Sequence, residues 1–252
     1  MNYKYFFGIA LFAFLTSCNN EQHLYKIEGK RIEINETLPS NDSIESFIAP
    51  YRKHINQSLD SVLAYSVSTY TKNDGELNTA LGNLMVDALF EQSNPVFKNR
   101  TGHEIDMALL NHGGIRSILS KGDVSIRTAY DLMPFENSAV VVALKGKYIN
   151  DLIDYLARAK RAHPISGLKL VLTKDNKVSS ATINGEPVDE NRTYYVLTND
   201  YLYNGGDHMN FFKEGDSLYV LDYKIRNALI DYFRKKDTLK PTIDDRFIQQ
   251  KN

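Results

Sequence analysis

Apolar side chains recur at helical spacing in five stretches of the chain, with polar residues between them. The first stretch begins at Asp42, where Ser43 can cap a helix, and its apolar positions run from Ile44 to Leu59 at intervals of three and four. Pro50 lies inside it and is expected to kink or divide the helix, because proline removes a backbone donor. The other predicted helices cover Leu81–Gln92, Ser125–Leu132, Tyr148–Lys160 and Lys224–Lys236.

Shorter runs rich in β-branched, aromatic or aliphatic residues predict strands between these helices. They cover Arg31–Asn35, Val62–Tyr70, Ile105–Leu110, Ala139–Leu144 and Tyr194–Thr198, together with a hairpin formed by Gly167–Thr173 and Val178–Ile183. Because helices alternate with strands and the hairpin adds antiparallel pairing, the pattern predicts a multilayer α/β domain with a mixed sheet. No repeat or long linker divides residues 43–252, so we expect one domain over that range.

The first 17 residues have the pattern of an export signal. Lys4 precedes an apolar run from Tyr5 to Leu15, which is shorter than the ~20 residues that span a bilayer. The run ends in Leu15-Thr16-Ser17-Cys18, which resembles a bacterial lipobox, and Cys18 is the single cysteine of the chain. We therefore expect a signal peptide over residues 1–17, a palmitate-type anchor on Cys18 and a polar tether over residues 18–42. The protein would be exported and membrane-anchored at the periplasmic or outer-membrane face. An ordinary signal peptide with an unrelated cysteine is the alternative.

Composition and missing motifs narrow the classes of function. The 252 residues carry 30 Lys and Arg against 31 Asp and Glu, and this net charge of −1 gives no basic field for nucleic acid. A single cysteine excludes a disulfide scaffold and a cysteine-rich zinc site. The P-loop, G-x-G-x-x-G and G-x-S-x-G motifs are missing, and the six histidines do not form the paired motifs of a two-metal hydrolase. We therefore expect no cofactor or metal in this chain.

Three segments combine flexible backbone with groups that bind ligands. Asn111-His112-Gly113-Gly114-Ile115-Arg116 is a glycine turn that ends in a guanidinium suited to a phosphate or carboxylate. Tyr201-Leu202-Tyr203-Asn204-Gly205-Gly206-Asp207 is a second glycine turn, whose aromatic and carboxylate groups suit a base and a ribose diol. Met133-Pro134-Phe135-Glu136-Asn137 sets an aromatic residue before a predicted strand. Taken singly, each segment fits an ordinary turn or a core aromatic residue as well as a binding site.

In this order, the three segments resemble the C-terminal domain of the 5'-nucleotidase family. The shared patterns are N-x-G-G-I-R, P-F-x-N before an apolar strand, and N-G-G-D after an aromatic residue. Leu81-Gly82-Asn83-Leu84-Met85-Val86-Asp87-Ala88 matches that family's L-G-N-L-x-x-D-A helix start, so the resemblance covers residues 60–248. It implies the fold of this domain, which binds the nucleotide, while a separate N-terminal metallophosphoesterase domain holds two metal ions and cleaves the phosphate ester.

The resemblance implies roles at the base and the ribose. Phe135 and Tyr201 would sandwich the base, with Tyr replacing the Phe often found at the second position. Asn137 would contact the base, and Asp207 would hold the ribose hydroxyls.

The same resemblance implies a phosphate end at the first glycine turn. Arg116 would help to hold the phosphate, while Asn111 and the backbone amides of Gly113 and Gly114 would line the site. His112 occupies a variable position and is expected to be a spectator.

Two departures from the family pattern shape the expected function. Family members carry an Arg shortly before L-G-N, whereas residues 73–80 contain none and Lys72 is the nearest cation. The metallophosphoesterase part is also outside the resemblance. The leading hypothesis is therefore the nucleotide-recognition component of a 5'-nucleotidase-type hydrolase in nucleotide catabolism, inactive alone. A separately encoded metallophosphoesterase would bring the divalent metal pair, and the ligand would be a nucleoside 5'-monophosphate or a nucleoside. The alternative is a non-catalytic, nucleoside-binding surface lipoprotein, and a third reading is a surface protein that keeps only the fold.

Overall fold

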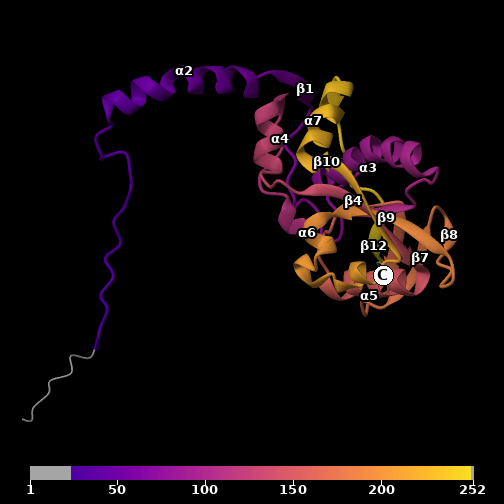
Figure 1. Ribbon diagram of the computed structural model, residues 1–252. Helices are drawn as coiled ribbons and strands as arrows, with labels where there is room; N and C mark the ends of the chain where they lie inside the picture. Colours follow the sequence, from indigo (N-terminus) through magenta and orange to yellow (C-terminus); the bar gives the residue numbers. More distant parts are fainter. Residues whose placement is uncertain (1–23, 251–252) are drawn as a thin grey trace, which may run out of the picture. The chain divides into compact units, whose positions relative to one another are not determined.

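The computed structural model of the chain describes residues 24–250 (Figure 1). Contacts divide the chain into two units, which separate between Ile48 and Ala49. The expected signal peptide and Cys18 lie outside the described residues. Within residues 24–250, none of the helices combines the length and the apolar character needed to cross a membrane.

The helix α2 (Asp42–Leu59) confirms the first predicted helix, with two differences. Its cap is Asn41 rather than Ser43, because Asn41 Oδ1 accepts hydrogen bonds from the backbone N–H groups of Ser43 (3.1 Å) and Ile44 (3.3 Å). Pro50 lies inside the helix without dividing it. The strand predicted over residues 31–35 is wrong: these residues are exposed and form no strand, because no neighbouring strand pairs with them.

A mixed five-stranded sheet organises the unit that begins at Ala49, in the order β10-β4-β9-β2-β5. Its strands are β2 (Met107–Leu109), β4 (Ser138–Lys145), β5 (Ile165–Ser166), β9 (Thr193–Asn199) and β10 (Ser217–Lys224). β4 runs antiparallel to both β9 and β10, whereas β2 and β9 are parallel. The sequence did not predict β10, because half of the residues of this edge strand are exposed and only one is buried, so its apolar pattern is weak.

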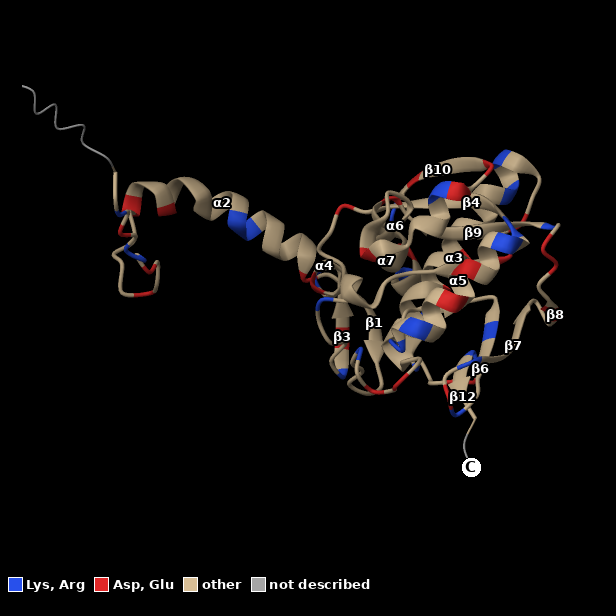
Figure 2. Cartoon of the chain, turned by 90° about the horizontal axis from the view of Figure 1, so that it is seen from below, with Lys and Arg blue, Asp and Glu red and all other residues tan. Residues whose placement is uncertain are grey.

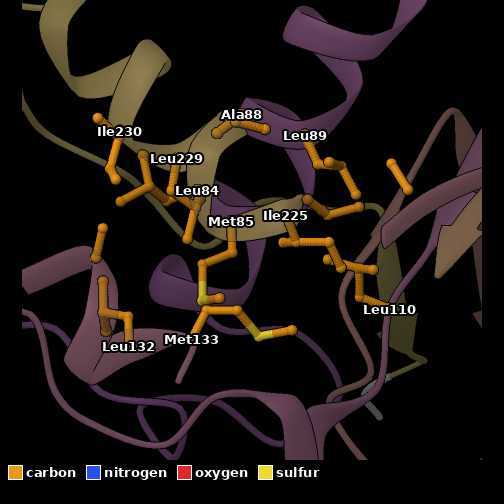
Figure 3. Packing of buried hydrophobic residues seen from close by; sticks show 14 of the residues in the cluster. Leu84, Met85, Ala88, Leu89, Leu110, Leu132, Met133, Ile225, Leu229 and Ile230 are labelled. Atoms are coloured by element: carbon orange, nitrogen blue, oxygen red, sulfur yellow. The ribbon is translucent and has the colours of Figure 1, made fainter. Parts of the chain in front are cut away.

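Helices cover both faces of this sheet. Val141 of β4 packs with α3 (Ala80–Thr101), α4 (Ile126–Leu132) and α7 (Ile225–Lys235) in one apolar cluster, part of which is shown in Figure 3. Val140 and Val142 point to the opposite face and pack with α5 (Gly146–Ala159). The alternation along β4 therefore produces a helix–sheet–helix arrangement, which confirms the predicted multilayer mixed α/β fold.

Two smaller mixed sheets complete the strands of residues 24–250. One has the order β11-β1-β3 and comprises β1 (Val62–Ser66), β3 (Gly122–Ser125) and β11 (Thr238–Leu239). The other has the order β12-β6-β7-β8 and comprises β6 (Leu168–Leu172), β7 (Val178–Ile183), β8 (Glu186–Pro187) and β12 (Phe247–Gln249). The predicted hairpin is confirmed as β6 and β7. The strand predicted over Val62–Tyr70 ends at Ser66, and Tyr70 forms only an isolated bridge with Leu119.

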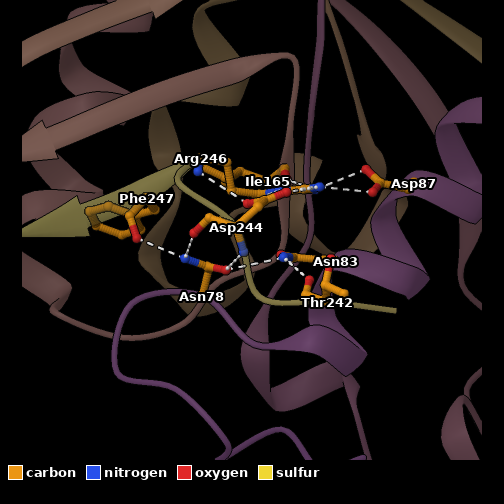
Figure 4. Close-up of polar contacts among 8 residues, drawn as sticks. All are labelled: Asn78, Asn83, Asp87, Ile165, Thr242, Asp244, Arg246 and Phe247. Carbon is orange, nitrogen blue, oxygen red and sulfur yellow. Dashed lines mark hydrogen bonds and ion pairs between the residues drawn. The ribbon is translucent and has the colours of Figure 1, made fainter. Parts of the chain in front are cut away.

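The L-G-N-L-x-x-D-A segment fastens the C-terminal part of the chain to α3, as Figure 4 shows. The Asn83 amide donates to Asn78 Oδ1 (3.0 Å) and to the Thr242 carbonyl (3.0 Å). The Asp87 carboxylate accepts two hydrogen bonds of 2.9 Å from Arg246. Asp87 and Asp244 raise the pKa of Arg246 against the opposing effect of burial, which is the largest influence on it. The polar residues of this motif therefore have a structural role.

Charged residues of both signs occur on the helices and loops (Figure 2). Exposed ion pairs such as Lys98–Glu104 join some of them, and exposed pairs contribute little to stability. The two apolar clusters on either side of the central sheet are therefore the main source of stability.

Candidate functional site

The segments that carry the predicted site residues meet at one edge of the five-stranded sheet. β2 and β9 are parallel, so the chain leaves Leu109 and Asn199 at the same edge. β4 is antiparallel to β9 and Ala139 lies opposite Asn199, so the residues that precede β4 lie at this edge as well. Strand topology therefore gathers two glycine turns and an aromatic loop that are far apart in the sequence.

The first glycine turn is tight and folds around a buried asparagine. Residues His112–Gly114 form the short helix η1, and Asn111 is buried beside it. A Cβ atom added to Gly114 would lie 3.0 Å from Asn111 Oδ1, and one added to Gly113 would lie 3.4 Å from Asn111 Nδ2. Glycine at these positions therefore lets the Asn111 amide lie against the backbone of the turn.

Arg116 and Phe135 are neighbours at the sheet edge. The central guanidinium carbon of Arg116 lies 5.9 Å from the centroid of the Phe135 ring, within the range of a cation–π contact. The Phe135 side chain is 41% exposed, which leaves ring surface free for a ligand. Asn137 is half-buried, and its carbonyl accepts a hydrogen bond from the Ile225 N–H (3.1 Å). A cation suited to phosphate thus lies beside an open aromatic ring.

The second glycine turn joins an aromatic ring directly to a carboxylate. After β9, Asn199 caps the short helix α6 (Asp200–Tyr203), and the helix η2 (Gly206–His208) follows. The Tyr201 hydroxyl donates to Asp207 Oδ1 (2.9 Å) and accepts from the Asp207 N–H (3.3 Å). This bond to the Asp207 carboxylate is the main cause that raises the pKa of Tyr201. A Cβ atom on Gly206 would lie 2.4 Å from the Tyr201 ring, so the glycine lets this ring, which is 45% exposed, lie against the turn.

Tyr155 and His163 connect the two turns, and sequence reasoning did not identify either residue. The Tyr155 hydroxyl donates to the Asp207 carbonyl (2.9 Å), while the His112 N–H donates to His163 Nδ1 (3.3 Å). The Tyr155 and His163 rings are tilted against each other, with centroids 5.7 Å apart. Burial lowers the pKa of His163 to about 4, although the negative charge of Asp207 acts in the opposite direction. The two turns therefore belong to one connected site.

Cations gather at the first turn even though residues 73–80 contain no arginine. Lys72 Nζ donates to the carbonyl of Ile115 (2.8 Å), the residue that precedes Arg116. His112 is tied to the same stretch, because its Nε2 lies 3.1 Å from the Lys72 carbonyl oxygen. Burial is the main cause that lowers the pKa of His112, and the charges of Lys72 and Arg161 act in the same direction. Besides its own Arg116, the first turn therefore has Lys72 and Arg161 close enough to act electrostatically on His112.

Two features bear on what the site can hold. Among the described residues, the Phe135 and Tyr201 rings do not contact each other. A base stacked between two rings lies ~3.5–4 Å from each of them, so the two rings must be about twice that distance apart to hold it. Within residues 24–250, no group of three or more His, Cys, Asp and Glu side chains is arranged to hold a metal ion.

Comparison with known proteins links this arrangement to one family. Residues 54–214 match the family model described as the C-terminal domain of 5'-nucleotidase. This range includes both glycine turns and the loop before β4.

Related proteins are longer than the chain. Cell wall protein Lmo0130 of Listeria monocytogenes is 29% identical over 176 residues, which cover 64% of the chain and 22% of that protein. Protein UshA of Escherichia coli is 27% identical over 192 residues, which cover 71% of the chain and 32% of that protein. The crystal structure of a 5'-nucleotidase precursor from Thermus thermophilus has the same fold, with a TM-score of 0.69 and 22% sequence identity. The matched region covers 85% of the chain and 44% of the Thermus protein. The chain thus spans less than half the length of each of these relatives.

Proposed function

The chain belongs to the family of 5'-nucleotidase C-terminal domains, and from this premise we propose that it is the nucleotide-recognition component of a 5'-nucleotidase-type phosphomonoester hydrolase in nucleotide catabolism. Its ligand is a nucleoside 5'-monophosphate or a nucleoside. A metallophosphoesterase on a separate chain supplies the divalent metal pair and the attacking water. The chain itself orients the nucleotide, and correct positioning alone lowers a reaction barrier by several kcal/mol.

The observation that supports this proposal most strongly is the meeting of Arg116, Phe135, Tyr201 and Asp207 at one sheet edge. The open faces of the two rings suit a planar base, and aromatic–base stacking contributes about 1–3 kcal/mol per base. Tyr201 engages Asp207 Oδ1, which leaves Oδ2 to accept a ribose hydroxyl. Arg116 and Lys72 supply positive charge for the phosphate.

Isothermal titration calorimetry on the purified chain tests recognition directly. We expect binding of adenosine 5'-monophosphate and weaker binding of ribose 5-phosphate, because the latter lacks the stacked base. Tyr201→Ala should weaken binding of the nucleotide. Tyr65→Ala replaces a tyrosine of similar exposure on a different sheet and should leave this binding unchanged. Absence of binding by the unaltered protein would remove the basis of the proposal.

The split between two chains has its own test. Phosphate release from adenosine 5'-monophosphate is measured with this chain, with a metallophosphoesterase encoded next to it, and with their mixture, at matched metal concentration. We expect phosphate release by the mixture to be faster than the sum of the rates measured for the two proteins separately. Rates that simply add would contradict the proposed division of labour.

A second candidate is a binding protein that captures nucleosides without hydrolysis. Lys72 Nζ is already engaged by the Ile115 carbonyl, and residues 73–80 contain no arginine that could bind the phosphate instead. These two observations favour a site that binds the nucleoside without a full set of phosphate-binding cations. Adenosine that binds as tightly as adenosine 5'-monophosphate would support this candidate. Clearly tighter binding of the monophosphate would exclude it.

We also propose that the protein is exported and anchored through an acyl chain on Cys18. The lipobox-like residues Leu15-Thr16-Ser17-Cys18 motivate the anchor, and Lmo0130, described as a cell wall protein, supports export. Metabolic labelling with palmitate should mark the unaltered protein in membranes and should fail for Cys18→Ala. Equal labelling of both forms would refute acylation at Cys18.

A further inference from the structure

The loop that carries Phe135 is fastened by the first turn of α7. Arg226 is buried, with 6% of its surface exposed, and its guanidinium lies 4.0 Å from the centroid of the Tyr130 ring. Its Nη1 donates toward the carbonyls of Met133 (3.5 Å) and Pro134 (3.3 Å), and its Nη2 pairs with the Glu136 carboxylate. One buried cation therefore contacts the loop on both sides of the aromatic residue.

Two neighbours of Arg226 hold the rest of the loop. Lys224 Nζ donates to the Glu136 carbonyl (2.6 Å) and to Ser138 Oγ (3.0 Å). The Ile225 N–H donates to the Asn137 carbonyl (3.1 Å). The carbonyls of residues 133, 134, 136 and 137 thus all accept hydrogen bonds from residues 224–226, while the Phe135 side chain remains exposed.

Stability alone does not explain why a buried guanidinium holds this loop. Removing a charge from water costs free energy unless hydrogen bonds satisfy it, and a well-packed apolar group would often stabilise the fold equally well. Arg226 Nε has no hydrogen-bond partner among the described residues, so the solvation of this group is incomplete. What the guanidinium does provide is a planar fork of donors that fixes several backbone carbonyls at once.

Order in this loop matters for binding because the ring it carries is exposed. A mobile Phe135 would lose conformational freedom when a base stacks on it, and preorganisation removes that cost from the binding free energy. Resting on the proposed function, we propose that Arg226 is a positioning residue, which holds Phe135 and Asn137 in place for the base of the nucleotide without touching the ligand itself.

The test separates the base from the rest of the ligand. In Arg226→Gln, binding of adenosine 5'-monophosphate should weaken by about tenfold, because the loop and the Phe135 ring would then have to be ordered when the base binds. Binding of ribose 5-phosphate should change by less than about twofold, because it does not contact the loop. Arg226→Lys keeps the charge but not the fork and should recover only part of the affinity. Arg234→Gln, on the exposed side of the same helix, is the control.

A ligand-free measurement accompanies the titrations. Exchange of the amide hydrogens of Met133, Phe135, Glu136 and Asn137 should speed up in Arg226→Gln and remain unchanged in Arg234→Gln. Equal weakening of both ligands would indicate general destabilisation and overturn the proposal, as would unchanged affinity for the nucleotide. If the glutamine variant does not fold, Glu136→Gln removes the same ion pair at its exposed end and should give a smaller loss with the same preference for the base-containing ligand. Wild-type protein that binds neither ligand would overturn the proposed function and this role together.

Discussion

The buried histidine between the two turns should make the stability of the protein dependent on pH. His163 is 3% exposed, and its Nδ1 accepts the His112 N–H, which fits the neutral ring with its hydrogen on Nε2. Burial is the main cause that lowers the pKa of His163 from 6.5 to about 4; nearby His112 and Arg161 act in the same direction, while Asp207 and the Leu110 carbonyl oppose it. The folded protein therefore keeps this ring neutral under mildly acidic conditions.

The sign and size of the effect follow from proton linkage. A histidine in the unfolded chain takes up a proton near pH 6.5, whereas His163 in the folded protein does so only near pH 4. As the pH falls between these values, the unfolded state binds the extra proton and the free energy of unfolding decreases. At about 1.4 kcal/mol per pKa unit, the loss reaches about 3 kcal/mol at pH 4 and is absent above pH 6.5.

His163→Gln removes the titration while its amide oxygen can still accept the His112 N–H. Urea denaturation of both proteins, followed by far-ultraviolet circular dichroism from pH 7 to pH 4, isolates the histidine because the carboxylates titrate in both. We expect the variant to lose about 3 kcal/mol less stability than the wild type over this range. His54→Gln replaces an exposed histidine and serves as the matched control. Parallel pH dependences of wild type and His163→Gln would refute the reasoning.

Three further substitutions test the site and the core. Phe135→Ala should weaken binding of adenosine 5'-monophosphate by about 1–3 kcal/mol in calorimetry, and unchanged affinity would mean that the ring does not stack on the base. Gly206→Ala places a methyl group 2.4 Å from the Tyr201 ring, so the ring must leave its position against the turn. Binding of adenosine 5'-monophosphate should then weaken by about 1–3 kcal/mol, the contribution of a stacked base, and unchanged affinity would show that the base does not need the ring in this position. Leu229→Ala opens a cavity in the cluster of Figure 3 and should lower the free energy of unfolding by about 2–5 kcal/mol without altering ligand specificity. A loss of stability below about 1 kcal/mol would contradict the place of Leu229 in the core.

Periodicity predicted the elements with a strong apolar face and failed where the face is weak. β4 is buried along most of its length and α5 has a clear apolar side, so both were predicted with nearly correct bounds. β10 was missed because an edge strand with exposed side chains has no such signal. The predicted helix over Leu81–Gln92 is α3, which continues past Pro95 to Thr101. The sequence signal for its end is Gly102, which adopts φ = 77° and donates its N–H to the Lys98 carbonyl.

The residues predicted to touch a ligand came from motifs, whereas the residues that support them have no local signature. Tyr155 lies 52 positions from Asp207, His163 lies 51 from His112, and Arg226 lies 93 from Met133 along the sequence. Their partners are set by how α5 and α7 pack on the central sheet, and no spacing rule within one segment encodes that.

The geometry of the second turn shows why such supports are needed. Asp207 and His208 both have positive φ angles, 51° and 61°, in a region that costs a residue with a side chain roughly 1–2 kcal/mol. Strained residues of this kind persist only where their surroundings fix them. Here the Tyr155 hydroxyl holds the Asp207 carbonyl and the Tyr201 hydroxyl holds its N–H and carboxylate. The position of the carboxylate that faces the ribose in the proposed site therefore depends on α5 and α6 as much as on the glycine turn that carries it.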